Sequence, residues 1–332
     1  WTISNGPCTP NPNTDDVVIR VFNRNAPVAT AGPAQNLCAP IASVTLAGNA
    51  ATAPATGTWT VISGAGTFGN LNSPSSTVSG MALGVNVYRW TINNGPCPGA
   101  ITSSDVTITL FNPALAAANA GPDQNLCGSS SATLVGSTVT APAVGTWTVV
   151  SGGATIANAN SAITSIAGLG SGTVVMRWSV NNGPCGNTSD DVTIRNYDPN
   201  NPVANAGPDL SICIPVAPNS VTMAGSAIIA PAVGTWTLVS GGGTIAAVNN
   251  PTTQITAMPV GINVFRWAVN NGPCPNGATA DTIRVLVYSD ANPVANAGPD
   301  QSLCTTSGSA TMAGSSIIVP AIGTWTLVSG TG

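Results

Sequence analysis

The chain has 332 residues, of which 7 are basic and 11 are acidic, so its formal net charge at pH 7 is −4. Every basic residue is arginine, every acidic residue is aspartate, and there is no histidine, lysine or glutamate. Without histidine, Ser-His-Asp sites, Cys-His sites and histidine-containing zinc sites are impossible, and the lack of basic clusters argues against nucleic acid or an anionic membrane as partner. We therefore expect a protein that is not an enzyme and needs no cofactor.

Hydrophobic residues make up 43% of the chain, and they are patterned rather than clustered. A disordered segment lacks such patterned apolar residues, so this composition predicts a folded protein. No run of apolar residues reaches the length that crosses a bilayer, and we expect no membrane insertion within this sequence.

Cysteines recur in two sequence contexts, and each context repeats at a nearly constant spacing. Those that follow Ala-Gly-Pro are 89, 86 and 91 residues apart, and those of the Asn-Gly-Pro-Cys motif are 89, 88 and 89 residues apart. The two series are Cys38, Cys127, Cys213 and Cys304, and Cys8, Cys97, Cys185 and Cys274. A period near 90 residues is too long for a solenoid turn and matches a small β-sandwich domain.

This period divides the chain into five parts. We predict a partial repeat at 1–24, complete repeats at 25–112, 113–198 and 199–289, and a second partial repeat at 290–332. The first part holds two predicted strands, F and G, at Trp1 and at 16–22. Two strands cannot build a core, so we expect this part to end a domain and the sequence to be a window of a longer protein.

The first complete repeat contains about seven short stretches in which apolar and polar residues alternate. The stretches predict strand A at 27–38, B around Val44 and Leu46, C at 57–61, a short strand at 76–79, F at 85–93 and G at 106–110. Short strands with evenly spaced turn signals are typical of a Greek-key sandwich. The later repeats follow the same plan, and 290–332 carries strands A to C with Trp325. The predicted fold class is therefore all-β, a tandem array of seven-stranded Greek-key sandwiches that forms a rod.

Each complete repeat has one tryptophan on strand C and one on strand F. They are Trp59, Trp90, Trp147, Trp178, Trp236 and Trp267. Period-two alternation places these side chains in the core, and we expect the two rings of a repeat to face each other across the sandwich. An exposed sugar-binding platform is the alternative, but only 5% of the residues are aromatic, which leaves few beyond the cores.

The charged residues offer no obvious catalytic or metal site. Asp15-Asp16 and Asp190-Asp191 are adjacent pairs, and neighbours on a strand point to opposite faces, so they do not converge on one substrate. The outward arginines of strands F and G would repel each other unless aspartates lie between them. Because no Asp-x-Asp-x-Asp run occurs, we expect at most one weak calcium site at a linker, near Asp198 or Asp290.

Eight regularly placed cysteines predict disulfides and an oxidising location, and two pairing schemes are open. Pairing within a repeat would join Cys38 to Cys97, Cys127 to Cys185 and Cys213 to Cys274. However, strand A runs away from the N-terminal pole and strand F runs toward it. The cysteines of one repeat would then lie about 20–30 Å apart, whereas a disulfide needs Cα atoms within about 7 Å.

We favour pairing across the joints between repeats. The inter-domain pairs are Cys38 with Cys185 and Cys127 with Cys274. The remaining cysteines, Cys8, Cys97, Cys213 and Cys304, would then pair with domains outside this sequence. A bend at Ala-Gly-Pro could shorten strand A and restore the first scheme, so both remain alternatives at this point.

Three motifs carry a resemblance to a known group. Ala-Gly-Pro-Asp-Gln-Asn-Leu-Cys at 120–127, Gly-Thr-Trp-Thr-Val-Val-Ser-Gly at 145–152 and Arg-Trp-Ser-Val-Asn-Asn-Gly-Pro-Cys at 177–185 resemble the PKD-like and immunoglobulin-like repeats of very large surface proteins of Bacteroidota. Such proteins are typically exported by the type IX secretion system, and they include gliding-motility adhesins. The resemblance implies a secreted location at the cell surface.

Two functions agree with these patterns. The first is a non-catalytic stalk or filament segment of a large extracellular adhesin, in which each repeat advances the rod by roughly 40–45 Å. The second is a binding array in which each repeat contributes weak binding to glycan or a surface. The expected partners are neighbouring repeats of the same chain, and other filaments, surfaces or polysaccharide are further candidates. The repeats share cores and turns and show no obvious exposed aromatic or charged site, which favours the stalk.

Overall fold

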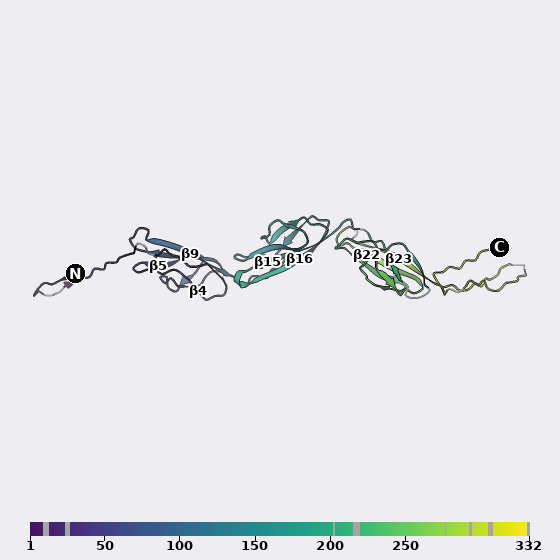
Figure 1. The fold of residues 1–332 in the computed structure, drawn as a ribbon, viewed down its shortest axis with the longest axis horizontal. Coiled ribbons are helices and arrows are strands. Elements are labelled where there is room, and N and C mark those ends of the chain that lie inside the picture. The colour runs from purple at the N-terminus through teal and green to yellow at the C-terminus, as the bar shows by residue number, and fades with distance from the viewer. Residues whose placement is uncertain are drawn as a thin grey trace.

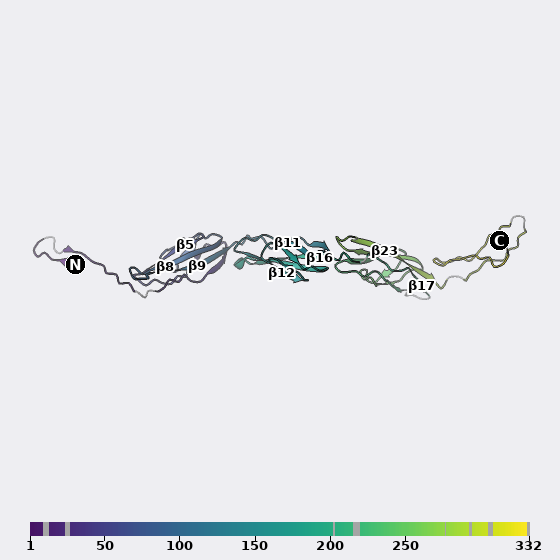
Figure 2. The ribbon, with the colours of Figure 1, turned by 90° about the horizontal axis from the view of Figure 1, so that it is seen from above.

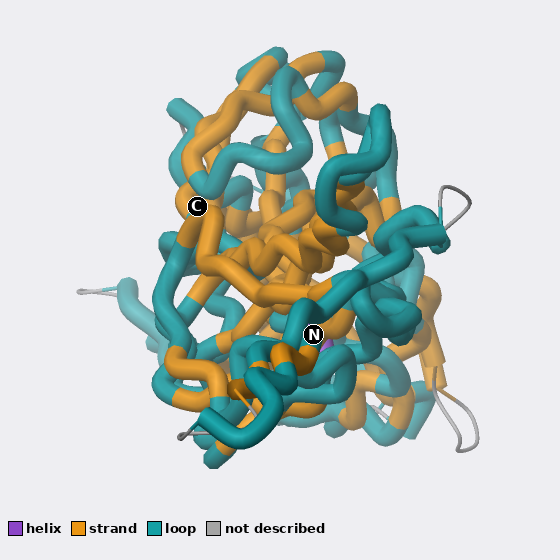
Figure 3. The backbone as a smooth tube through the Cα atoms, turned by 90° about the vertical axis from the view of Figure 1, so that its left-hand side faces the viewer, coloured by secondary structure: helices purple, strands orange, loops and turns teal. Residues whose placement is uncertain are grey.

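Three β-sandwiches follow one another along a line, with the two chain termini at opposite ends (Figure 1; Figure 2). The computed structural model describes residues 1–8, 13–23, 27–201, 203–214, 220–275, 277–291, 294–304 and 308–330. Seen along the long axis, the chain consists almost wholly of strands and loops (Figure 3). The predicted all-β tandem array of sandwiches is confirmed.

The first sandwich contains seven strands in two sheets. They are β3 (Gln35–Cys38), β4 (Ser43–Thr45), β5 (Thr56–Ser63), β6 (Thr67–Phe68), β7 (Thr77–Ser79), β8 (Gly84–Asn93) and β9 (Ile101–Phe111). One sheet has the order β3-β9-β8-β5 and the other β4-β7-β6. In immunoglobulin terms these sheets are A-G-F-C and B-E-D, which is the Greek-key arrangement.

The second sandwich repeats this plan. Its strands are β10 (Gln124–Cys127), β11 (Ser131–Val135), β12 (Val144–Ser151), β13 (Thr155–Ile156), β14 (Ile163–Ala167), β15 (Gly172–Asn181) and β16 (Asn187–Tyr197). A single 3-10 turn, η1 (Gly183–Cys185), lies between β15 and β16. The sheet orders are β10-β16-β15-β12 and β11-β14-β13, the same as in the first sandwich.

The third sandwich has the same order again. Its strands are β17 (Leu210–Ile214), β18 (Ser220–Thr222), β19 (Val233–Ser240), β20 (Thr244–Ile245), β21 (Gln254–Thr256), β22 (Gly261–Asn270) and β23 (Ala278–Ser289). Its sheets are β17-β23-β22-β19 and β18-β21-β20. Three repeats of one sequence pattern therefore give three sandwiches of one topology.

Alternate residues of the long strands form the core of each sandwich. On β8, Tyr88, Trp90 and Ile92 are buried, whereas the residues between them are partly exposed. The structure likewise buries all six tryptophans of strands C and F, which are at most 1% exposed. The period-two pattern of the sequence is thus the pattern of burial.

The two tryptophans of a repeat lie side by side within one sheet. Trp59 on β5 is the register partner of Trp90 on β8, and their ring centroids are 5.0 Å apart. Our prediction that the rings face each other across the sandwich is wrong, because strands C and F belong to the same sheet. Alternation shows that a side chain points inward, but it does not show which strand lies beside it.

Among the described residues of the two partial repeats, the strand predicted at Trp1 has a short counterpart at Thr2–Ile3, and the other predicted strands are absent. Among residues 1–8 and 13–23, the strands are β1 (Thr2–Ile3) and β2 (Asn13–Thr14), and 16–22 has no strand. The described residues from 294 onward also lack strands, although A to C were predicted there. In the complete repeats, strand A forms its hydrogen bonds with strand G, and strand C forms them with strand F. The described segments of the partial repeats do not have these neighbouring strands beside them.

The predicted domain limits remain predictions at the level of single residues. The boundary between 24 and 25 lies outside the described residues, as do parts of the linkers after Asp198 and Asp290.

Candidate functional site at the joints between repeats

The two kinds of cysteine lie at opposite ends of each sandwich. Strand β3 runs parallel to β9, and Cys38 is the register partner of Phe111, the last residue of β9. The backbone N–H of Ala39 donates to the carbonyl oxygen of Phe111 at 3.0 Å. Cys38 therefore lies at the end where the chain leaves the repeat. Strand F is antiparallel to strand G, so the Asn-Gly-Pro-Cys turn lies at the end where the chain enters.

Two disulfides connect neighbouring sandwiches. Cys38 is bonded to Cys185 with Cα atoms 5.0 Å apart, and Cys127 is bonded to Cys274 with Cα atoms 5.1 Å apart. The two cysteines of each bond are 147 residues apart in sequence. This separation is one repeat period plus the number of residues from the first to the second cysteine of a repeat. The cysteines at the facing ends of adjacent repeats are thus brought together, as the inter-domain scheme requires.

The alternative scheme, with Cys38–Cys97, Cys127–Cys185 and Cys213–Cys274, is not the pairing in the structure. Its physical obstacle is strand direction, since A ends at one pole and F at the other. The other four cysteines, Cys8, Cys97, Cys213 and Cys304, form no disulfide with one another in the described part of the chain, and their pairing with domains outside this sequence stays a prediction.

An aromatic ring at the end of strand G packs on the turn of the next repeat. A Cβ atom added to Gly183 would lie 2.7 Å from Cζ of Phe111, and one added to Gly272 would lie 2.6 Å from Cε2 of Tyr197. The φ angles of these glycines are 53° and 58°, in the left-handed region. The turn therefore needs glycine both for its backbone and for the approach of the ring.

A buried asparagine amide ties each joint to the backbone of the preceding repeat. Nδ2 of Asn182 donates to the carbonyl oxygen of Asn112 at 2.8 Å, and Nδ2 of Asn271 donates to that of Asp198 at 2.9 Å. Both asparagines are less than 10% exposed. A hydrogen bond in such a site adds to stability because an unpaired polar group there would lose its water.

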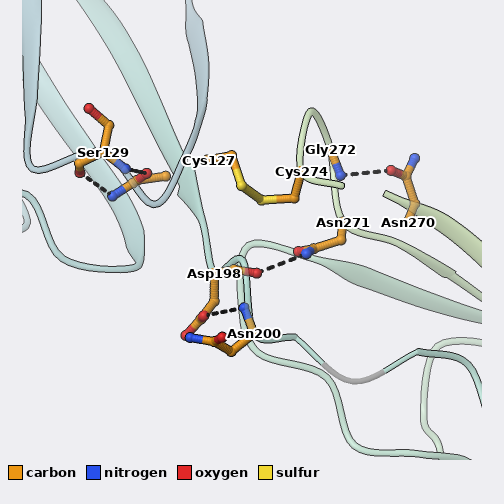
Figure 4. The surroundings of a disulfide bond; sticks show 9 residues. Cys127, Ser129, Asp198, Asn200, Asn270, Asn271, Gly272 and Cys274 are labelled. Atoms are coloured by element: carbon orange, nitrogen blue, oxygen red, sulfur yellow. Dashed lines mark hydrogen bonds between the residues drawn. A yellow bond between two sulfur atoms is a disulfide. The ribbon is translucent and has the colours of Figure 1, made fainter. Parts of the chain in front are cut away.

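The side chains around the second joint lock its local geometry (Figure 4). Oδ1 of Asn270 accepts from the backbone N–H of Gly272 at 3.0 Å, which shapes the turn that carries Cys274. Oδ1 of Asp198 accepts from the N–H of Asn200 at 2.8 Å, which shapes the linker. On the other side, Asn196 exchanges hydrogen bonds with the backbone of Ser129, two residues after Cys127.

The same non-covalent contacts occur where residues 13–23 meet the first sandwich. The ring of Phe22 lies against Gly95, and Nδ2 of Asn94 donates to the carbonyl oxygen of Asn23. These contacts were not among the features predicted from the sequence. A signal for them does exist, because an aromatic residue followed by Asn, Asp or Ser recurs with the repeat. These aromatic residues are Phe22, Phe111, Tyr197 and Tyr288.

The aspartate near the second joint has a backbone role. The carboxylate of Asp198 caps a turn in the linker, as described above. The described residues bring together no group of three or more potential metal ligands. The calcium expectation at Asp198 or Asp290 stays a prediction.

Ion pairs cross the outer face of the A-G-F-C sheet in the first two repeats. Nε of Arg89 lies 2.6 Å from Oδ1 of Asp105, and Nε of Arg177 lies 2.7 Å from Oδ1 of Asp191. These hydrogen bonds hold the pKa of each aspartate below its ordinary value and raise the pKa of each arginine. Aspartates of strand G thus lie beside the F-strand arginines of these two repeats, and they offset the repulsion between arginines that was expected from the sequence.

The adjacent residues Asp190 and Asp191 point to opposite faces of the sheet, as predicted. Asp190 points inward, where it accepts a hydrogen bond from the backbone N–H of Ala120 at 2.8 Å, while its neighbour Asp191 pairs with Arg177 outside. In the third repeat the position opposite Arg266 is Thr282, so this repeat lacks the equivalent ion pair. Asp190 and Asp191 therefore form no converging carboxylate pair.

The part of the chain that the structure describes contains no helix long and apolar enough to cross a membrane.

No protein-family model and no curated protein matches the chain. Among solved structures, a complex of Dpr2 Ig1-Ig2 with DIP-Theta Ig1-Ig3 is similar over 79% of this chain and 100% of that chain, with 13% identity and a TM-score of 0.45. Extracellular domains 3–5 of Drosophila OTK cover 82% of this chain and are covered in full, with 12% identity and a TM-score of 0.29.

A single PKD domain from the KIAA 1837 protein covers 28% of this chain, with 92% of that domain matched, 24% identity and a TM-score of 0.23. All three TM-scores are below 0.5. The assignment of an immunoglobulin-like fold therefore rests on the strand order of the chain itself.

Proposed function

We propose that the chain is a non-catalytic stalk segment of an extracellular protein, in which tandem sandwiches hold a distant part of the molecule away from its anchor. The observation that carries this proposal is the disulfide between the facing poles of successive repeats. A bond at this place restrains the relative orientation of two domains, which a short linker alone would leave freer. Stiffness at every joint is the property that a stalk requires.

The finer proposal is a stalk of a cell-surface adhesin of the type found in Bacteroidota. Two features support it. Disulfides form and persist outside the cytosol, and the repeat motifs resemble those of surface proteins from that group. Secretion by the type IX system and a part in gliding motility are expectations from the resemblance alone.

Weak binding by each repeat remains the alternative. The six core tryptophans are buried, so they are not available as a sugar platform. The arginines of the first two F strands are paired with aspartates, which reduces their attraction for an acidic polysaccharide. A glycan array probed with the oxidised chain tests this alternative, and binding that scales with the number of repeats would favour it.

Electron microscopy of the oxidised chain tests the stalk. We expect straight rods with three beads spaced by about 40–45 Å. After reduction, the distribution of angles between neighbouring beads should broaden, because the linker becomes the only covalent connection at each joint. Compact particles, or equal bending in both states, would contradict the proposal.

A further inference from the structure

We propose that the disulfides make the chain a two-path covalent rod, in which no single backbone break between Cys38 and Cys274 separates the two ends. One path follows the backbone to Cys38, crosses to Cys185 and continues to the C-terminus. The other follows the backbone to Cys127, crosses to Cys274 and continues. The spans that the two disulfides bridge, 38–185 and 127–274, overlap because Cys127 lies before Cys185 in the sequence.

The strands that carry these paths lie next to each other in every sandwich. Strands A and G are parallel neighbours in all three repeats, as the pairs β3·β9, β10·β16 and β17·β23 show. Both run from the entry pole to the exit pole. In the second sandwich the first path therefore uses only strand G, and the second path uses only strand A. The second path runs through the whole first sandwich, and the first path runs through the whole third sandwich.

Each joint exchanges the two paths. At the first joint, the peptide linker leads from Phe111 at the end of strand G to β10, which is strand A of the next repeat. The disulfide leads the other way, from Cys38 at the end of strand A to Cys185 just before strand G. Every described joint between complete repeats is thus crossed by two covalent connections.

This arrangement determines what a break can do. A cut between Cys38 and Cys127 leaves the first path intact, and a cut between Cys185 and Cys274 leaves the second. A cut between Cys127 and Cys185 leaves both. Pairing within repeats would protect the sandwiches but not the linkers, because there the linker would be the only connection.

The biological value of this redundancy rests on the proposed stalk function, since an exposed stalk meets proteases and tension. The covalent paths themselves do not depend on that function. Bent rods in the microscope would overturn the stalk and leave the paths untouched, and the experiment below tests the paths alone.

The experiment places a protease recognition site in the full chain at one of two positions. The linker site lies between the exposed residues Ala116 and Ala117, and the control site lies after the exposed Gly153, within the second sandwich. Free thiols are alkylated before denaturation, and cleaved samples are run with and without reductant. Two matched variants remove one bond each: Cys38→Ser with Cys185→Ser, and Cys127→Ser with Cys274→Ser.

Without reductant, the chain cut at the linker should run as one species, and with reductant as two fragments. Loss of the Cys38–Cys185 bond should separate the linker-cut fragments without reductant, whereas loss of the Cys127–Cys274 bond should not. The chain cut after Gly153 should stay joined in both variants, because one path survives in each.

Two results would overturn the proposal. The first is separation of the linker-cut parent chain without reductant, which is what pairing within repeats or absent bonds would give. The second is separation at the control site when only the Cys127–Cys274 bond is removed. The first result is read on the parent chain, so it does not depend on whether any variant keeps its native fold.

Discussion

Gly145 on β12 is a position where one methyl group should cost the second sandwich a measurable part of its stability. Gly145 pairs with Val180, and the ring of Trp178 lies diagonally across it. A Cβ atom at Gly145 would lie far inside van der Waals contact with Cζ2 and Cη2 of Trp178. Trp178 is 1% exposed and its centroid lies 5.1 Å from that of Trp147, so the ring has no free space to move into.

The size of the effect follows from two opposing contributions. Overpacking a core typically costs about 1–3 kcal/mol. Replacement of glycine by alanine also reduces the freedom of the unfolded chain, which stabilises by about 0.4–1 kcal/mol. We therefore expect Gly145→Ala to lower the free energy of unfolding of this sandwich by about 1–2 kcal/mol.

Gly153 provides the matched control. It lies just after β12 without a positive φ, and an added Cβ would meet nothing within 4 Å. Gly153→Ala should therefore be neutral, or stabilise by up to about 1 kcal/mol. The two substitutions make the same chemical change nearby in one sandwich, and the predicted signs differ because only Gly145 lies against a tryptophan.

Native-state hydrogen exchange reads this effect domain by domain. Amides of β15 should exchange about 5 to 30 times faster in Gly145→Ala, and no faster than in the parent chain in Gly153→Ala. Amides of β8 and β22 in the neighbouring sandwiches serve as internal references. Unchanged exchange in Gly145→Ala, or equal acceleration by both substitutions, would refute the packing argument.

Three further outcomes are expected. The free energy of unfolding should be constant from about pH 5 to 9. The pKa values of Asp105 and Asp191 are lowered in the folded state, so the stability that these aspartates contribute is complete above their ordinary pKa and is lost only as acid protonates them. A change of the urea midpoint within that pH range would contradict this. Phe111→Ala should cost about 3 kcal/mol or less and speed reduction of the first joint's disulfide, measured by thiol trapping; unchanged reduction would argue against the contact with Gly183. When the oxidised chain is stretched fully between its ends, the shortest covalent route runs to Cys38, across to Cys185, back along the backbone to Cys127 and across to Cys274. This route omits the two segments 38–127 and 185–274, each of 89 residues, so the oxidised chain should be shorter than the reduced chain by about 600 Å. Removal of either single bond should reduce the shortening to that of one 147-residue span, about 500 Å, and an unchanged limit would contradict the pairing.

The repeat, the strands and the inward tryptophans could be read from the sequence because they depend on local periodicity. A period of two in Tyr88, Trp90 and Ile92 expresses the pleat of a strand, whatever surrounds it. The direction of strands A and F also placed Cys38 and Cys97 at opposite poles, since chain direction is itself a property of sequence order.

Only the tertiary structure determined the contacts between residues that are far apart in sequence. Alternation could not show that Trp59 and Trp90 share a sheet, because inward side chains of either sheet look the same in the pattern. Nor could it place Phe111 on Gly183, since that contact depends on how one sandwich seats on the next. The strands predicted after residue 290 are absent from the described part for the same physical reason: a strand becomes ordered when its neighbours supply the hydrogen-bond ladder and the buried face.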